Sequence, residues 1–233
     1  DFFEIITFDK IINDKVDILF EISSITPKYT NQINIIGNSR TFDNVIRREL
    51  EIVEGDAVYK NQIQNIRKKL ISLNLFESVN IKEEILDDNT INLIIEVKEK
   101  QTGTFNAGVS VGTLDGFSIV TGLRERNFYG TGRSLDVLVN TSNDKNQFKL
   151  ITTDRLSYEN DADISYSINY KQEDFSTASS YTLDTFSSGV GIGYQISNNL
   201  YHNVDLEYAL KDYKVTNSST VSNIISNSSG SSI

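Results

Sequence analysis

The sequence predicts a small α+β domain with the element order βααββ, followed by antiparallel transmembrane β-barrel strands. In the second half of the chain, apolar and polar residues alternate in long runs, which places one set of side chains on each face of a β-strand. In residues 25–99, two segments with apolar residues three and four apart lie between alternating segments, which indicates two helices among strands. The chain has 233 residues, enough for more than one domain.

The alternation is clearest in three runs, which begin at Ala162, Val190 and Val204. A strand of about ten residues with one apolar and one polar face is typical of a transmembrane β-barrel. We expect one set of residues to face lipid: Ala162, Ile164, Tyr166, Ile168, Val190, Ile192, Val204 and Leu206. We expect a second set to face the lumen: Asp163, Ser165, Gly191 and Glu207.

Shorter alternating runs earlier in the chain bring the expected total to about seven strands. Seven strands cannot close as a bacterial barrel, and each unpaired backbone group in lipid costs several kcal/mol, so we expect an incomplete barrel. This barrel region is assigned to residues 100–233, with long loops at about 172–188 and 216–233.

The α+β domain is assigned to residues 25–99. Its first helix has an apolar stripe formed by Phe42, Val45, Ile46 and Leu50, and its second has one formed by Ile63, Ile66, Leu70 and Leu73. Residues 1–24 end in an alternating strand at Val16–Ile22, and we interpret them as the tail of a preceding domain.

The composition argues against several function classes. A net charge of −10 disfavours nucleic-acid binding, which needs clustered Lys and Arg. The chain has no Cys and a single His, His202, so no metal site or catalytic triad can be assembled around these residue types. We therefore expect no catalytic residue, no metal, no cofactor and no enzyme activity. Gly130-x-Gly132 lies between two strands without a following helix, which favours a turn over a phosphate loop.

Four short motifs follow one another between about residues 25 and 140. They are Ile33-x-Ile35-x-Gly37-Asn38-x-Arg40-Thr41 with the helix that follows, Leu73-Asn74-Leu75-Phe76, Glu96-Val97-Lys98-Glu99 before Thr102-Gly103, and Glu125-Arg126-Asn127-Phe128-Tyr129-Gly130-Thr131-Gly132. Together they resemble the outer-membrane insertase superfamily, whose members join POTRA domains to a β-barrel. The last motif resembles the periplasmic turn E-x-N-x-x-G-x-G of that superfamily. The chain departs from the family at Asn74, where Gly is usual, and at 153–157, where a Pro is missing.

The resemblance implies an outer-membrane β-barrel assembly and insertion factor, with its membrane-proximal POTRA domain in the periplasm of a Gram-negative bacterium. The implied partners are unfolded outer-membrane protein clients, a BamD-like lipoprotein, other assembly-machine subunits and outer-membrane lipid. Arg47 and Glu54 match partner-binding positions of the family, and Glu125, Asn127, Gly130 and Gly132 match its periplasmic turn. The implied lateral-gate strand consists of Thr104, Phe105, Asn106, Ala107, Gly108, Val109, Ser110 and Val111.

Two alternatives remain open at this point. One is a TamA-like protein or a two-partner secretion transporter of the same superfamily. The other is a passive porin-type barrel with an accessory domain, although a passive pore has no need of the βααββ unit or of the turn motif.

Overall fold

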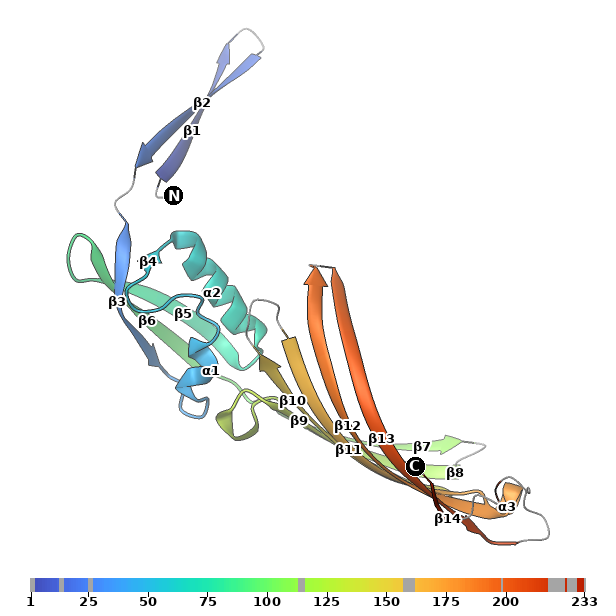
Figure 1. Ribbon diagram of the computed structural model, residues 1–233. Helices are drawn as coiled ribbons and strands as arrows, with labels where there is room; N and C mark the ends of the chain where they lie inside the picture. Colours follow the sequence, from blue (N-terminus) through green and yellow to red (C-terminus); the bar gives the residue numbers. More distant parts are fainter. Residues whose placement is uncertain are drawn as a thin grey trace. The chain divides into compact units, whose positions relative to one another are not determined.

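The computed structural model describes residues 3–12, 15–24, 27–112, 116–156, 162–197, 199–217, 225 and 230–232. The chain forms two compact units, one of residues 1–39 and 46–99 and one of residues 40–45 and 100–233. Figure 1 follows the elements of both along the chain. Among the described residues, no helix has both the length and the apolar character needed to cross a membrane.

The first unit begins with a separate antiparallel hairpin. Strands β1 (Phe3–Ile12) and β2 (Lys15–Ser24) pair along their whole lengths and form a two-stranded sheet. The alternating strand expected at Val16–Ile22 is therefore confirmed, and its partner is longer than the Phe3–Phe8 segment that the sequence suggests.

The rest of the first unit is a four-stranded sheet with two helices, in the strand order β4-β3-β6-β5 (Figure 1). Its strands are β3 (Lys28–Ile36), β4 (Ala57–Val58), β5 (Phe76–Ile85) and β6 (Thr90–Glu99). Its helices are α2 (Lys60–Ser72) and the end of α1 (Asp43–Arg47), whose first three residues belong to the second unit. β3 and β6 run parallel, and the other two pairs are antiparallel. The predicted βααββ order is confirmed, with the two-residue strand β4 added before α2.

The core of this unit lies between one face of the sheet and the helices. β6 alternates buried and partly exposed residues, which is the pattern of a strand with one covered face. The fully buried side chains include Ile33, Ile46, Leu50, Ile66, Leu70, Val79, Ile91, Leu93 and Ile95. Burying each such aliphatic side chain contributes about 1.5–3 kcal/mol.

Two details of the sequence prediction change. Phe42 is 55% exposed, because α1 begins only at Asp43 and Phe42 therefore precedes the helix instead of lying on its buried stripe. Asn74, which replaces the usual Gly of the family, has a φ of 61°. Asn tolerates this left-handed conformation better than most residues, so the departure from the family motif preserves the turn after α2.

The second unit is an antiparallel sheet in which each strand pairs with its neighbour in the chain (Figure 1). The strands are β7 (Gly103–Gly112), β8 (Gly116–Glu125), β9 (Ser134–Ser142), β10 (Lys145–Leu156), β11 (Ala162–Asp174), β12 (Tyr181–Ser197), β13 (Leu200–Val215) and β14 (Gly230–Ser232). The seven expected strands are β7 to β13. β14 is a short addition inside the segment 216–233 that was expected to be a loop, and it pairs with Lys211–Tyr213 of β13. Most other residues of that expected loop lie outside the described residues.

The prediction of a long loop at residues 172–188 is wrong. β11 continues to Asp174 and β12 begins at Tyr181, so that only a short connection with the one-turn helix α3 (Ser176–Ser179) remains. Backbone pairing continues through this segment, where charged residues such as Asp184 and Lys214 replace the apolar members of the alternation. The hydrophobic pattern therefore ends before the strands do.

Candidate functional site

The register gives the large sheet two chemically different faces. One row of paired residues crosses seven strands and contains a single polar residue, Ser188; its members are Phe105, Leu123, Val137, Leu150, Ile168, Ser188 and Tyr208. The adjacent row on the other face is mostly polar or glycine; its members are Thr104, Arg124, Asp136, Ile151, Ser167, Gly189 and Glu207. The residues predicted to face lipid all have the parity of the first row, and those predicted to face the lumen all have the parity of the second.

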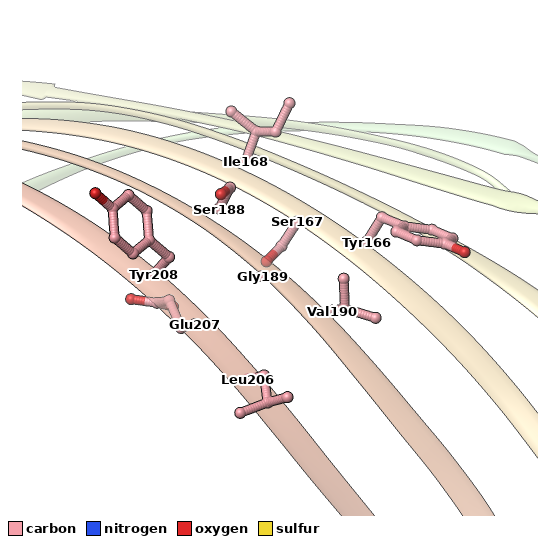
Figure 2. Close-up of a pocket in the computed structure, with 9 residues that line it drawn as sticks. All are labelled: Tyr166, Ser167, Ile168, Ser188, Gly189, Val190, Leu206, Glu207 and Tyr208. Atoms are coloured by element: carbon pink, nitrogen blue, oxygen red, sulfur yellow. The ribbon is translucent and has the colours of Figure 1, made fainter.

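The apolar face is hollowed where β11, β12 and β13 run side by side. The pocket there has a volume of about 630 Å³. Figure 2 shows its lining, with Ser188 and Gly189 between the larger side chains of Tyr166, Ile168 and Tyr208. Its lining is largely apolar and lies in the middle of the strands. Ser167, Ser188 and Glu207 are the polar residues of the lining, and the rest of it is aliphatic, aromatic or glycine.

The glycines of β12 make room for side chains from neighbouring strands. A Cβ atom at Gly193 would collide with the ring of Tyr201, whose hydroxyl donates a hydrogen bond of 3.1 Å to Asp163 on β11. A Cβ at Gly191 would collide with Asp205 and Ser165. The space at these glycines is filled by polar side chains of the same face.

The expected gate strand is β7, which lies at one end of the large sheet and has β8 as its strand partner among the described residues. Its ten residues contain no charge and no Pro, and all of them are exposed. A Cβ at Gly108 would meet no atom within 4 Å. Edge strands of soluble sheets usually carry charges, Pro or bulges that block pairing, and β7 has none of these side chains.

The turn motif between β8 and β9 forms a hydrogen-bonded unit within the second unit of the chain. The Asn127 side chain accepts a hydrogen bond from the Gly132 amide and donates one to the Thr41 hydroxyl, both at 2.8 Å. The Glu125 carboxylate accepts hydrogen bonds from the Asn127 amide, at 2.8 Å, and from the Thr102 hydroxyl.

Gly130 completes this unit. Its carbonyl accepts a hydrogen bond of 2.8 Å from the Phe42 amide, and a Cβ at this position would collide with the Arg40 carbonyl. Gly130 and Gly132 have φ values of 76° and 72°, which favour glycine. The motif thus closes a turn and binds residues 40–42, and its glycines serve the turn geometry that the sequence favours over a phosphate loop. Thr41 and Thr102, which are 2% and 5% exposed, belong to the motifs quoted above, but the motifs do not reveal their hydrogen bonds to Asn127 and Glu125.

The expected partner-binding residues, Arg47 and Glu54, contact each other in the first unit. Arg47 Nη1 lies 3.0 Å from Glu54 Oε1, and Arg47 Nη2 donates a hydrogen bond of 2.9 Å to the Ile33 carbonyl. Hydrogen bonds from its own backbone amide and from Arg47 hold the pKa of the Glu54 carboxyl below its usual value. The side chains of Arg47 and Glu54 are 40% and 43% exposed, so both keep a solvent-facing surface.

Two family models match the chain. The POTRA model, described as surface antigen variable number repeat, matches residues 28–100. The Omp85 superfamily domain matches residues 127–232. The first match coincides with the four-stranded sheet and its helices, and the second with the sheet from the turn motif onward.

Similar proteins and structures agree with these matches. The outer membrane protein assembly factor BamA of Neorickettsia risticii is 38% identical over 130 residues, which are 54% of this chain and 17% of that protein. BamA of Nitratidesulfovibrio vulgaris is 26% identical over 221 residues, which are 90% of this chain and 28% of that protein. The chain therefore spans less than a third of either relative.

The fold is shared with a crystal structure of BamA from Haemophilus ducreyi that lacks POTRA domains 1–3. The TM-score is 0.74 at 22% sequence identity, over 92% of this chain and 42% of that one. With a POTRA domain followed by an Omp85 domain, both matching BamA proteins, this chain belongs to the Omp85 superfamily as part of a BamA-type protein.

Proposed function

We propose that this chain is the membrane-proximal part of an outer-membrane β-barrel assembly factor. Its POTRA domain lies in the periplasm, and its alternating strands lie in the outer membrane. The observation that carries the proposal is the undefended edge of β7, which begins a long antiparallel sheet directly after a POTRA domain. The relatives are named as outer membrane protein assembly factors, which supports the same role.

The mechanism follows from the physics of sheet edges. An unfolded client adds a strand to the edge of a POTRA sheet through backbone hydrogen bonds, which do not depend on the client's side chains. The client then pairs with β7, the lateral-gate strand, and leaves through the seam of the barrel. Burial of its apolar face in lipid drives the process, so no nucleotide is needed.

The composition of β7 suits a seam that opens. Gly103, Gly108 and Gly112 lie in a ten-residue strand, and a glycine within a strand weakens it by about 0.5–1 kcal/mol relative to Ala. Without charges or Pro, the free edge accepts any strand of the right length. In a passive pore such an edge would be a site of aggregation, whereas in a template it is required.

The partners follow from the same proposal. Unfolded outer-membrane proteins are the clients, and a BamD-like lipoprotein contacts the exposed side of the Arg47–Glu54 pair, next to other subunits of an assembly machine. The half-exposed guanidinium and carboxylate offer one donor surface and one acceptor surface to such a partner.

The test is reconstitution of the complete protein into liposomes, with folding of a urea-unfolded client barrel followed by its protection from protease. We expect faster client folding than in liposomes that contain a porin at the same density. Ion conductance without faster folding would identify a passive barrel instead. Secretion of a passenger without faster folding would identify a transporter of the same superfamily.

A further inference from the structure

The β3 edge on the side of β4 is paired by backbone for only part of its length. β4 pairs with β3 at Lys28 and Tyr29. One step further, the Thr30 amide donates to the Asp56 carbonyl at 2.8 Å, and the Thr30 carbonyl accepts from the Gly55 amide at 2.7 Å. The chain then leaves the edge, and no strand among the described residues continues the pairing along Ile33–Ile36 on this side.

Side chains take the place of a strand at Ile33. The Ile33 amide donates to Glu54 Oε1 at 3.4 Å, and the Ile33 carbonyl accepts from Arg47 Nη2 at 2.9 Å. A neighbouring strand supplies the same two contacts, one acceptor and one donor, to every second residue of an edge. The ion pair between Arg47 and Glu54, at 3.0 Å, holds these two groups side by side. The pair therefore acts as a side-chain substitute for the next residues of β4.

Such a cover is easily displaced. Both side chains are partly exposed, and exposed ion pairs contribute little because water and salt compete with them. A backbone strand that pairs with Ile33 replaces both hydrogen bonds and can extend to the next residues of β3, which the ion pair does not reach. When a strand displaces the Arg47–Glu54 pair, two side-chain hydrogen bonds to Ile33 are lost and a longer series of backbone hydrogen bonds along β3 is formed.

The two faces of this sheet define what such a strand looks like. On one face, Ile91, Leu93 and Ile95 of β6 are buried under the helices. On the other, Asn80 and Lys82 donate hydrogen bonds to Glu96 at the surface. A strand added beside β3 presents alternate side chains to these two environments. The backbone hydrogen bonds form with any strand, but a strand with alternating apolar and polar residues fits both environments best, and this is the pattern of an outer-membrane β-strand.

We infer that the edge of β3 from Ile33 to Ile36 binds an extended segment of a client outer-membrane strand, and that the Arg47–Glu54 pair covers this edge until it is displaced. This inference rests on the proposed function, which supplies clients of this pattern. The proposed partner contact at Glu54 would then expose the binding edge, because a partner that binds the Glu54 carboxylate removes it from the Ile33 amide.

The test uses the complete protein in detergent micelles with a photo-crosslinking amino acid at the exposed position Gln32 on β3. The probe is a synthetic peptide with the sequence of β11, Ala162–Asp174, which alternates as required. Glu54→Ala and Arg47→Ala should each raise the crosslinking yield by about three- to tenfold, since each removes a hydrogen bond that competes with the peptide. A peptide with Pro at the positions of Ser165, Ser167 and Asn169 should not crosslink, because Pro removes the ladder donors.

Three controls make the result decisive. Glu96→Ala breaks a comparable exposed ion pair on the open face and should leave the yield unchanged. A crosslinker at Glu83 on β5, the opposite edge of the sheet, should show no response to Glu54→Ala. Circular dichroism confirms that each variant is folded.

An unchanged yield at Gln32 in both folded variants would overturn the inference. So would an equal rise at Glu83, which would indicate general loosening of the domain. The client-folding assay, run on the protein without substitutions, reports on the proposed function separately. Normal client folding with no peptide captured at Gln32 therefore refutes only this edge.

Discussion

Single residues in the turn motif perform tasks that the motif pattern does not reveal. Asn127 joins the turn before β9 to Thr41, which lies 86 positions earlier in the chain. Local patterns such as alternation and helical spacing report only on near neighbours in sequence, so this bond could not be predicted. What the sequence does predict here is the turn itself, because Gly130 and Gly132 adopt positive φ values that glycine favours.

Replacing Asn127 by Ala should loosen the turn. The change leaves the Gly132 amide and the Thr41 hydroxyl without this partner, which costs about 1–3 kcal/mol and speeds local opening by roughly 5- to 150-fold. Hydrogen–deuterium exchange at the Phe42 and Gly132 amides measures that opening in the complete protein. Asn31→Ala, which removes an exposed bond of 3.0 Å to Asn92, is the matched control and should leave both amides unchanged. Equal exchange in the two variants would contradict the role given to Asn127.

Glu54 is the second residue that yields a prediction. Glu54→Lys should lower co-purification of a BamD-like lipoprotein with the complete protein by at least about fivefold, because a lysine faces the partner with the wrong charge. Glu96→Lys, on the open face of the POTRA sheet, changes charge equally and should have no effect. The domain should stay folded by circular dichroism. Undiminished recovery of the lipoprotein would remove Glu54 from the partner site.

Strands and helices were predictable to the extent that their sequences show the regular spacing of apolar and polar residues that one buried face requires. Alternation located β7 to β13, and the three-and-four spacing located both POTRA helices, because burial of one face selects these patterns. The ends of β11 and β12 were missed, since charged residues such as Asp184 and Lys214 stand at the apolar positions there and only backbone pairing continues. β4 was missed because two residues are too few to show any period.

The assignment of the two faces predicts how strands tolerate charge. Ile192→Arg should lower the free energy of unfolding by about 2–4 kcal/mol if this residue lies near the bilayer midplane. Ser167 has the opposite parity and lies in one row with Glu207, so Ser167→Arg should cost much less. Gly191 would be a poor control, because any side chain there collides with Asp205 and Ser165. Urea unfolding in lipid vesicles, followed by circular dichroism, measures both variants; equal losses would refute the lipid-facing assignment.

The whole molecule adds a property that no strand shows alone. The row that runs from Phe105 to Tyr208, apolar except at Ser188, crosses seven strands only because each hairpin keeps its register. A slip by one residue would turn a strand's apolar side chains to the polar face. β7 pairs with β8 along its whole length, and its side chains continue both the apolar and the polar face of the sheet. If β7 opens as a lateral gate, the cause is therefore its uncharged, glycine-containing sequence and its free edge. Fixing that edge to the closing strand tests the lateral gate.

In the complete protein, a disulfide between Ala107→Cys or Val109→Cys and a cysteine on the closing strand should abolish assembly of other barrels. The locked barrel itself should stay folded, because the bond adds a constraint and removes no contact. This chain has no cysteine of its own, so no thiol within it competes for the engineered bond. Assembly is measured by client folding in liposomes, before and after reduction, and reduction should restore it.

The matched control joins Ala107→Cys to Thr121→Cys, its paired neighbour on β8. That disulfide fixes β7 to a strand it already pairs with and leaves the seam free, so client assembly should continue. A passive pore would conduct ions equally with either bond and would show no difference between them in any assembly assay. Full assembly by a protein whose seam is verified as crosslinked would eliminate the lateral gate, because the client would then have no edge of β7 to pair with.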